Sequence, residues 1–308
     1  MTDALDIRKQ LIRIAKEGKR SSQEILQYYA MERFLYRLSV SDYNNRFILK
    51  GGLLFTAWNF NNFRVTQDID LLGLTKNRPE NIAQICKELC SFDAQDGIVF
   101  DPTTIATSII RPENDYQGVQ VKFKGVLGPT KLHMRVDIGF ADAVYPKPTA
   151  FVFPTILELS APRLLGYTQE SVVAEKVDAM LQLGELNSRM KDFYDVWYLA
   201  HRIPFKMSTL TEALKATLTT RKTEVPERPN IFEPSFWTHA IKQEQWKNFY
   251  RQNRFEGIPE FPQLMGELEI FLKPILVGLA RKCSKDVGWS PTSFIWSNLI
   301  GGFVDELQ

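Results

Sequence analysis

The chain has 308 residues, of which 44% are hydrophobic and 24% are charged, and its formal net charge is +2 at pH 7. This composition is typical of a folded globular protein and excludes a disordered chain, while the small net charge gives no global nucleic-acid signature. Three cysteines without disulfide-type spacing, and no apolar segment long enough to cross a bilayer, predict a cytoplasmic protein without membrane contact.

The first half of the chain combines helical patterns with short β-type segments. Apolar residues at helical spacing predict helices, and short β-branched runs bounded by Pro, Gly, Asn and Asp predict strands. Ser21 and Glu24 resemble a capping box at the start of the second helix. The predicted helices are 5–17, 22–39, a short one after Gly52, and 79–91, and the predicted strands are 65–72, 98–100, 105–110, 119–123 and 132–138. We expect one sheet of four or five strands with helices packed on it.

The second half is mainly helical. A Pro-rich loop over 224–234 separates two of its helices. The predicted helices are 170–184, 188–202, 208–222, 235–250 and 263–283. The fold class is therefore α+β, with a mixed sheet and packed helices in a domain over 1–150 and a mainly helical domain over 151–308.

Two acidic residues two positions apart, Asp68 and Asp70, are the main chemical feature. On a strand this spacing points both carboxylates to one face and Ile69 and Leu71 to the other. The carboxylates repel each other, and a divalent cation such as Mg²⁺ would remove the repulsion. Asp137, between two aliphatic residues of a later predicted strand, is the candidate third ligand of a site for two ions roughly 3.5–4 Å apart. The alternative is a surface strand with alternating acids.

Upstream lies the sequence Lys50-Gly51-Gly52. Backbone N–H groups of a Gly-Gly turn can approach a phosphate closely, although such a turn is usually only a turn. Fifteen residues separate Gly52 from Asp68. The order of glycines, paired acids and a later acid is more specific than each part alone.

This combination resembles the nucleotidyltransferase superfold and, within it, the AbiEii/AbiGii toxin family of bacterial type IV toxin–antitoxin systems. The resemblance covers residues 45–200, about half the chain. The matching residues are Lys50, Gly51, Gly52, Arg64, Thr66, Asp68, Asp70, Val136, Asp137, Ile138, Gly139, Glu175, Lys176, Ala179, Ser188, Arg189, Lys191, Asp192 and Asp195. The family implies a Mg²⁺-dependent nucleotidyltransferase whose catalytic domain is the N-terminal one.

The resemblance also implies roles. Asp68, Asp70 and Asp137 would bind two Mg²⁺ ions, and Asp137 would help to activate the acceptor hydroxyl. The implied nucleotide-binding residues are Lys50, Gly51, Gly52, Arg64, Thr66, Lys176 and Arg189, and Asp192 and Asp195 would act in catalysis or nucleotide positioning. From the residues alone, Lys176 also fits a solvated helix face, and the two acids fit a helix start capped by Ser188.

The acceptor is less defined. Between Arg202 and Arg254 there are ten Lys or Arg, five Glu and no Asp, interleaved with aromatic residues. Such a segment fits RNA binding, and it fits an ordinary helical core equally well. The resemblance favours NMP transfer from an NTP to the 3′ end of tRNA, which blocks translation, and a cognate antitoxin in phage defence or another stress response. The alternatives are NMP transfer to a protein, a catalytically silent nucleotide- or RNA-binding member, and a metal-dependent nuclease.

Overall fold

The computed structural model describes residues 3–60, 64–110, 118–281 and 287–298. The chain divides into two compact units, which are described separately. The first unit comprises Met1–Asp142 and Pro148–Tyr167, and the second comprises Ala143–Lys147 and Thr168–Gln308.

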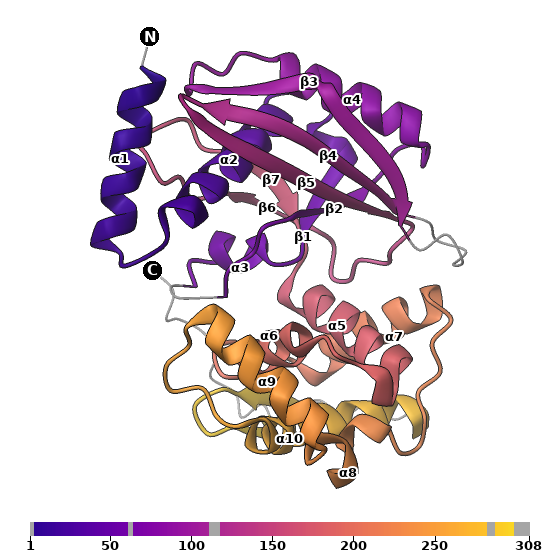
Figure 1. Ribbon diagram of the computed structural model, residues 1–308. Coiled ribbons are helices and arrows are strands. Elements are labelled where there is room, and N and C mark those ends of the chain that lie inside the picture. The colour runs from indigo at the N-terminus through magenta and orange to yellow at the C-terminus, as the bar shows by residue number, and fades with distance from the viewer. Residues whose placement is uncertain (1–2, 61–63, 111–117, 282–286, 299–308) are drawn as a thin grey trace. The chain divides into compact units, whose positions relative to one another are not determined.

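A mixed sheet forms the centre of the first unit (Figure 1). In the described part of the chain it has seven strands, in the order β3-β4-β5-β2-β1-β7-β6. The strands are β1 (Phe47–Lys50), β2 (Ile69–Gly73), β3 (Ile98–Ile110), β4 (Gly118–Leu127), β5 (Thr130–Phe140), β6 (Thr149–Val152) and β7 (Arg163–Gly166). The β2–β5 and β1–β7 pairs are parallel and the others antiparallel. This confirms the α+β class with a mixed sheet, but the expected number of strands, four or five, was wrong.

The helices of the first unit lie close to their predicted positions. They are α1 (Ala4–Glu17), α2 (Ser22–Ser39), the 3-10 helix η1 (Asn44–Arg46), α3 (Leu53–Ala57) and α4 (Pro79–Ser91). The predicted capping box of α2 is wrong, because among the described residues the Ser21 side chain makes no capping bond. Glu24 instead accepts a hydrogen bond from Arg20 Nε at 2.8 Å.

The two faces of the sheet differ in burial along β5. Even-numbered residues of β5 from Leu132 to Phe140 are buried. They face α2, since Gln27 Nε2 lies 3.7 Å from Met134 Sδ and donates to the His133 carbonyl. Odd-numbered residues of β5 therefore point to the opposite face, because side chains alternate along a strand.

Buried charges hold α2 in place. Asp96 accepts hydrogen bonds from Arg33 Nε (2.9 Å) and Arg37 Nη1 (2.7 Å), and all three side chains are buried. Glu32 is also buried and accepts the Ile156 N–H at 2.8 Å. Burial raises the pKa of Glu32 to about 7, because the charged form loses its hydration.

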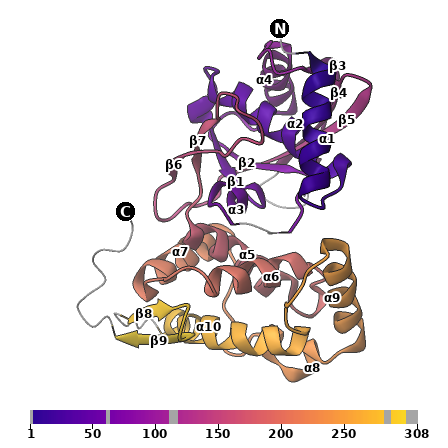
Figure 2. The ribbon, with the colours of Figure 1, turned by 90° about the vertical axis from the view of Figure 1, so that its left-hand side faces the viewer.

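The second unit is mainly helical. Its elements are α5 (Gln169–Leu183), η2 (Gly184–Leu186), α6 (Met190–Ala200), α7 (Met207–Thr220), η3 (Asn230–Phe232), α8 (Pro234–Trp237), α9 (Ala240–Asn253), α10 (Phe261–Arg281), β8 (Val287–Ser290) and β9 (Ile295–Asn298). Figure 2 shows the β8–β9 hairpin beside α10, where the Trp296 and Phe271 rings stack. The predicted helix 235–250 is broken between α8 and α9, because His239 Nδ1 accepts the Ile241 N–H and starts a new helix. Within the described ranges, no helix combines the length and apolarity needed to cross a membrane.

Candidate active site

Asp70 and Asp137 lie beside each other on neighbouring strands. Strands β2 and β5 are parallel, and Asp70 is the register partner of Asp137. Ile69 and Leu71 are buried, so the predicted alternation of acid and aliphatic side chains along this segment is confirmed. Both carboxylates are therefore on the sheet face opposite α2.

Asp68 lies in a bend one residue before β2, and not in the predicted strand 65–72. The strand starts later because β1 ends at Lys50, which pairs with Asp70, and leaves the residues before Ile69 without that neighbour. Asp68 still approaches the other two acids through Arg135, whose Nε lies 3.6 Å from Asp68 Oδ1. The structure thus gathers the three predicted carboxylates around one guanidinium.

Arg135 is the residue of this group that the sequence analysis missed. Its Nη2 donates to Asp137 Oδ2 at 2.7 Å and its Nε to Asp137 Oδ1 at 3.2 Å. The hydrogen bond to Asp137 and the charges of Asp68, Asp137 and Asp70 raise the pKa of Arg135. Gln120, the β4 register partner of Asp137, donates to Asp137 Oδ1 at 2.9 Å. The available signal was the strand period, which puts positions 135 and 137 on one face.

The Gly51–Gly52 turn lies against Asp70 and the residues before it. Gly51 has φ +71°, and a Cβ there would lie 2.7 Å from Asp70 Cγ. A Cβ on Gly52 would lie 2.9 Å from Thr66 Oγ1 and 3.4 Å from Arg64 Nη2. The close approach of backbone to side chain requires glycine at Gly51, and it brings four predicted nucleotide-binding residues next to Asp70 at one end of β1 and β2.

Lys50 ends β1 on the same face. Its Nζ lies 2.6 Å from Asp142 Oδ2 and 5.6 Å from the centre of the Tyr167 ring. Gly139 leaves room for this pair, since a Cβ there would lie 3.4 Å from Lys50 Nζ. Asp142 was not predicted, and its pairing gives Lys50 a second possible partner besides a phosphate.

The three carboxylates suit a divalent cation in kind, because Mg²⁺ prefers hard oxygen ligands. As arranged here, however, no group of three acidic, His or Cys side chains within the described ranges is spaced to hold a metal ion. The Arg135 guanidinium already supplies positive charge among these acids. The three carboxylates are therefore the right kind of ligand for Mg²⁺, and Arg135 lies where it would compete with the ion for them.

A second predicted group forms a buried cluster in the second unit. Lys176 of α5 forms ion pairs with Asp192, at 3.1 Å from Oδ1, and with Asp195 of α6. Arg189 Nε lies 2.7 Å from Asp192 Oδ2. The two acids are 1% and 0% exposed and Lys176 is 9% exposed, so a solvated helix face for Lys176 is excluded. The alternative N-cap at Ser188 is also wrong, since α6 begins at Met190 with Arg189 in the capping position.

A sequence model of the family described as "Nucleotidyl transferase AbiEii toxin, Type IV TA system" matches residues 33–266. The chain belongs to this family. It is accordingly a nucleotidyltransferase of toxin–antitoxin type, and the family implies an NTP substrate and an antitoxin partner.

Two solved structures are similar to this AbiEii-family chain. JHP933 from Helicobacter pylori is 14% identical, with 85% of this chain and 95% of that chain covered and a TM-score of 0.48. A proposed nucleotidyltransferase from H. pylori is also 14% identical, with 86% and 100% covered and a TM-score of 0.48. No curated protein matches the chain significantly.

The basic and aromatic segment of this AbiEii-family chain contributes to the core of its second unit. Phe205, Phe232, Phe236 and Trp246 are buried, and Trp246 packs 5.5 Å from the ring of Phe261. Buried rings are not available to stack bases. The ordinary helical interpretation is therefore right for these four aromatics, whereas Trp237, Phe249 and Tyr250 of the same segment are partly exposed.

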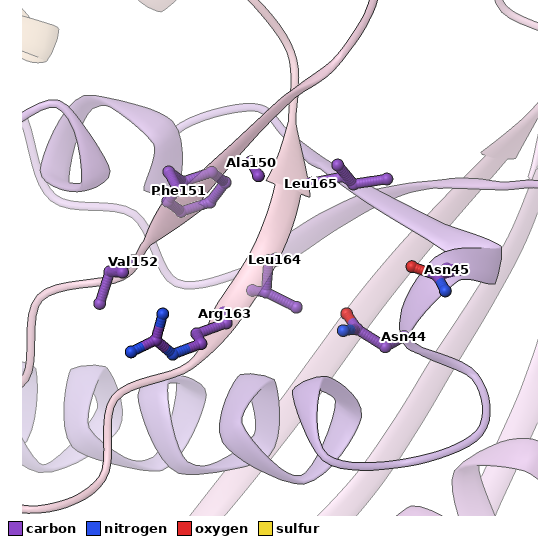
Figure 3. A pocket seen from close by; sticks show the side chains of 8 residues that line it. All are labelled: Asn44, Asn45, Ala150, Phe151, Val152, Arg163, Leu164 and Leu165. Atoms are coloured by element: carbon purple, nitrogen blue, oxygen red, sulfur yellow. The ribbon is translucent and has the colours of Figure 1, made fainter.

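The first unit also has a cavity of about 370 Å³ beside β6 and β7 (Figure 3). Its lining includes the apolar Leu164 and Leu165 and three polar side chains, Asn44, Asn45 and Arg163. None of its lining residues is a predicted site residue, so we assign the cavity no part in the nucleotidyltransferase site.

Proposed function

We propose that this protein transfers an NMP group from an NTP to the 3′ end of tRNA in a Mg²⁺-dependent reaction, and thereby blocks translation. The observation that carries the proposal is the register pairing of Asp70 with Asp137 next to the Gly51–Gly52 turn. Two carboxylates on adjacent strands repel each other unless a cation lies near them. A phosphate can approach the backbone N–H groups of Gly51 and Gly52 closely because these residues have no Cβ.

In the proposed reaction, the acceptor hydroxyl attacks the α-phosphate of the NTP. A new P–O bond forms, the bond to the β-phosphate breaks and pyrophosphate leaves. Asp137 accepts the hydroxyl proton, while Gly51 and Gly52 N–H groups and Arg64 hold the phosphates. Mg²⁺, when bound by Asp68, Asp70 and Asp137, would neutralise phosphate charge in the transition state.

For the second unit we propose that Lys176 is a triphosphate ligand and that Asp192 and Asp195 hold its ammonium group in position. The buried ion pairs of Lys176 support this, because they restrict the side chain to one geometry before the ligand arrives. Arg189, whose side chain is partly exposed, is proposed as a further nucleotide-binding residue.

An RNA acceptor is supported by the surplus of ten basic over five acidic residues between Arg202 and Arg254. Family membership supports an antitoxin that neutralises the activity, with phage defence or another stress response as the biological role. These proposals concern the acceptor and the biological role, and the proposed transfer of an NMP group does not depend on them.

The test is incubation of the purified protein with total tRNA, Mg²⁺ and each labelled NTP in turn. Wild type should move label into tRNA. Asp70→Asn should remove this label transfer with folding intact, whereas Asp101→Asn, an exposed acid of β3, should retain it. Label in protein would indicate a protein acceptor, shortened RNA a nuclease, and Mg²⁺-dependent NTP binding without turnover a silent member.

A further inference from the structure

Arg135 uses both oxygens of Asp137. Oδ2 accepts from Arg135 Nη2 at 2.7 Å, and Oδ1 accepts from Arg135 Nε at 3.2 Å and from Gln120 Nε2 at 2.9 Å. The same guanidinium lies 3.6 Å from Asp68. Both acceptor sites of Oδ1 are therefore engaged, and a metal ion at Oδ2 would lie beside the positively charged guanidinium, so that the two cations would repel each other.

We propose that Arg135 is a resident counter-ion of the carboxylate site, which must leave Asp137 before a divalent cation binds and which therefore lowers the affinity for that cation. The proposal rests on the proposed function, because it takes Asp68, Asp70 and Asp137 as the metal ligands. It assigns Arg135 a positioning role, in which it pairs with Asp137, lies near Asp68 and reduces the repulsion among the three acids until the metal arrives.

The exposure of the side chains makes this exchange feasible. The Arg135 side chain is 44% exposed, against 18% for Asp137 and 33% for Asp68. A half-exposed guanidinium can rotate into water and regain its hydration. Gln120 stays as a neutral donor to Oδ1 of Asp137, so the carboxylate remains oriented after Arg135 has left.

A purely structural role makes a different prediction. If Arg135 only ties β5 to the start of β2, its removal lowers stability and leaves metal affinity unchanged. If it is a counter-ion, its removal raises metal affinity, and added metal then stabilises the variant more than the wild type. Metal affinity therefore separates the two roles.

The experiment is titration with Mn²⁺ alone, with the free ion counted from its electron paramagnetic resonance signal. The variants are Arg135→Gln, Asp70→Asn, and Lys122→Gln as the matched control. Lys122 is the β4 register partner of Arg135, so its change removes the same charge from the same sheet face without touching the bonds to Asp137. We expect Arg135→Gln to lower the Mn²⁺ dissociation constant by about tenfold or more, because a charge-assisted hydrogen bond no longer has to break.

The outcomes distinguish the two proposals. Unchanged affinity in Arg135→Gln, with binding lost in Asp70→Asn, overturns the counter-ion role and leaves the metal site standing. No Mn²⁺ binding in any variant, or binding that Asp70→Asn does not affect, overturns the metal site and the counter-ion role together. If Arg135→Gln does not fold, Arg135→Lys keeps the charge but loses the bidentate contact, and it should bind Mn²⁺ more tightly than wild type; equal affinity overturns the proposal.

Discussion

Replacing Lys176 by methionine removes the cation shared by two buried carboxylates. Breaking a buried ion pair by removing one partner costs about 3–5 kcal/mol, because a charge stays buried without compensation. Arg189 Nε, 2.7 Å from Asp192, still neutralises that acid. The loss then falls mainly on Asp195, which is 0% exposed, so the lower end of about 3 kcal/mol is expected. For a unit of this size, this lowers the melting temperature by roughly 6–12 °C.

The assay is urea unfolding near neutral pH of Lys176→Met, Asp195→Asn and the double variant. The double variant should be more stable than Lys176→Met, since the uncompensated charge is gone, with a coupling free energy of about 1–3 kcal/mol. Lys191→Met removes an exposed lysine of α6, the helix that carries Asp195, and should change stability by less than about 0.5 kcal/mol.

Equal stability of Lys176→Met and wild type would refute the reasoning, because it would mean that water reaches both acids after all. The double variant also isolates the functional role. If Lys176 binds the triphosphate, nucleotide transfer stays lost in the double variant although stability has returned. If transfer returns with stability, Lys176 acts only in the fold.

Two further predictions concern the first unit. Gly51→Ala should abolish transfer and lower stability, because its Cβ meets Asp70, whereas Gly257→Ala, at the similar φ of +70° in open space, should show only the backbone strain in a urea titration. Burial raises the pKa of Glu32 from 4.5 to about 7, so the folded chain holds this proton more tightly than the unfolded chain. The stabilisation that Glu32 contributes through this proton should be complete below about pH 4.5 and should be lost, by about 3 kcal/mol, as the pH rises through 7. Urea midpoints of wild type and Glu32→Gln at about pH 5 and pH 8 will report it, and an equal pH slope in the two proteins would contradict this assignment.

Strong local patterns carried most of the fold prediction. The helices over 22–39 and 79–91 agree with α2 and α4 at both ends, because their apolar stripes are long and face a core. The adjacency of Asp70 and Asp137 was harder to derive, since it depends on strand order. The two residues share a hydrophobic setting in the sequence, but only the parallel β2–β5 pairing brings them together.

The missed features depend on partners that lie far away in the sequence. Strands β6 and β7 have four residues each, and pairing with neighbours stabilises them more than any pattern of their own. The buried Arg33 and Arg37 were hidden for a related reason. Charged residues on a helix normally predict a solvated face, and their partner Asp96 lies about sixty residues on, just before β3.

In both acidic clusters a basic side chain reduces the repulsion between carboxylates: Arg135 in the first unit and Lys176 in the second. Arg135 is half-exposed and Lys176 is buried, and this difference decides which of the two can be displaced by another cation. A half-exposed ion pair is much weaker than a buried one, so a divalent ion can displace Arg135 for the roughly tenfold loss in affinity expected above. Displacing the buried Lys176 from Asp195 would cost several times more. Lys176 can therefore bind a phosphate only while it keeps its carboxylate partner, as one more ligand of an ammonium group that has three donors. The acids around Arg135 are the exchangeable ones, and those around Lys176 belong to the framework.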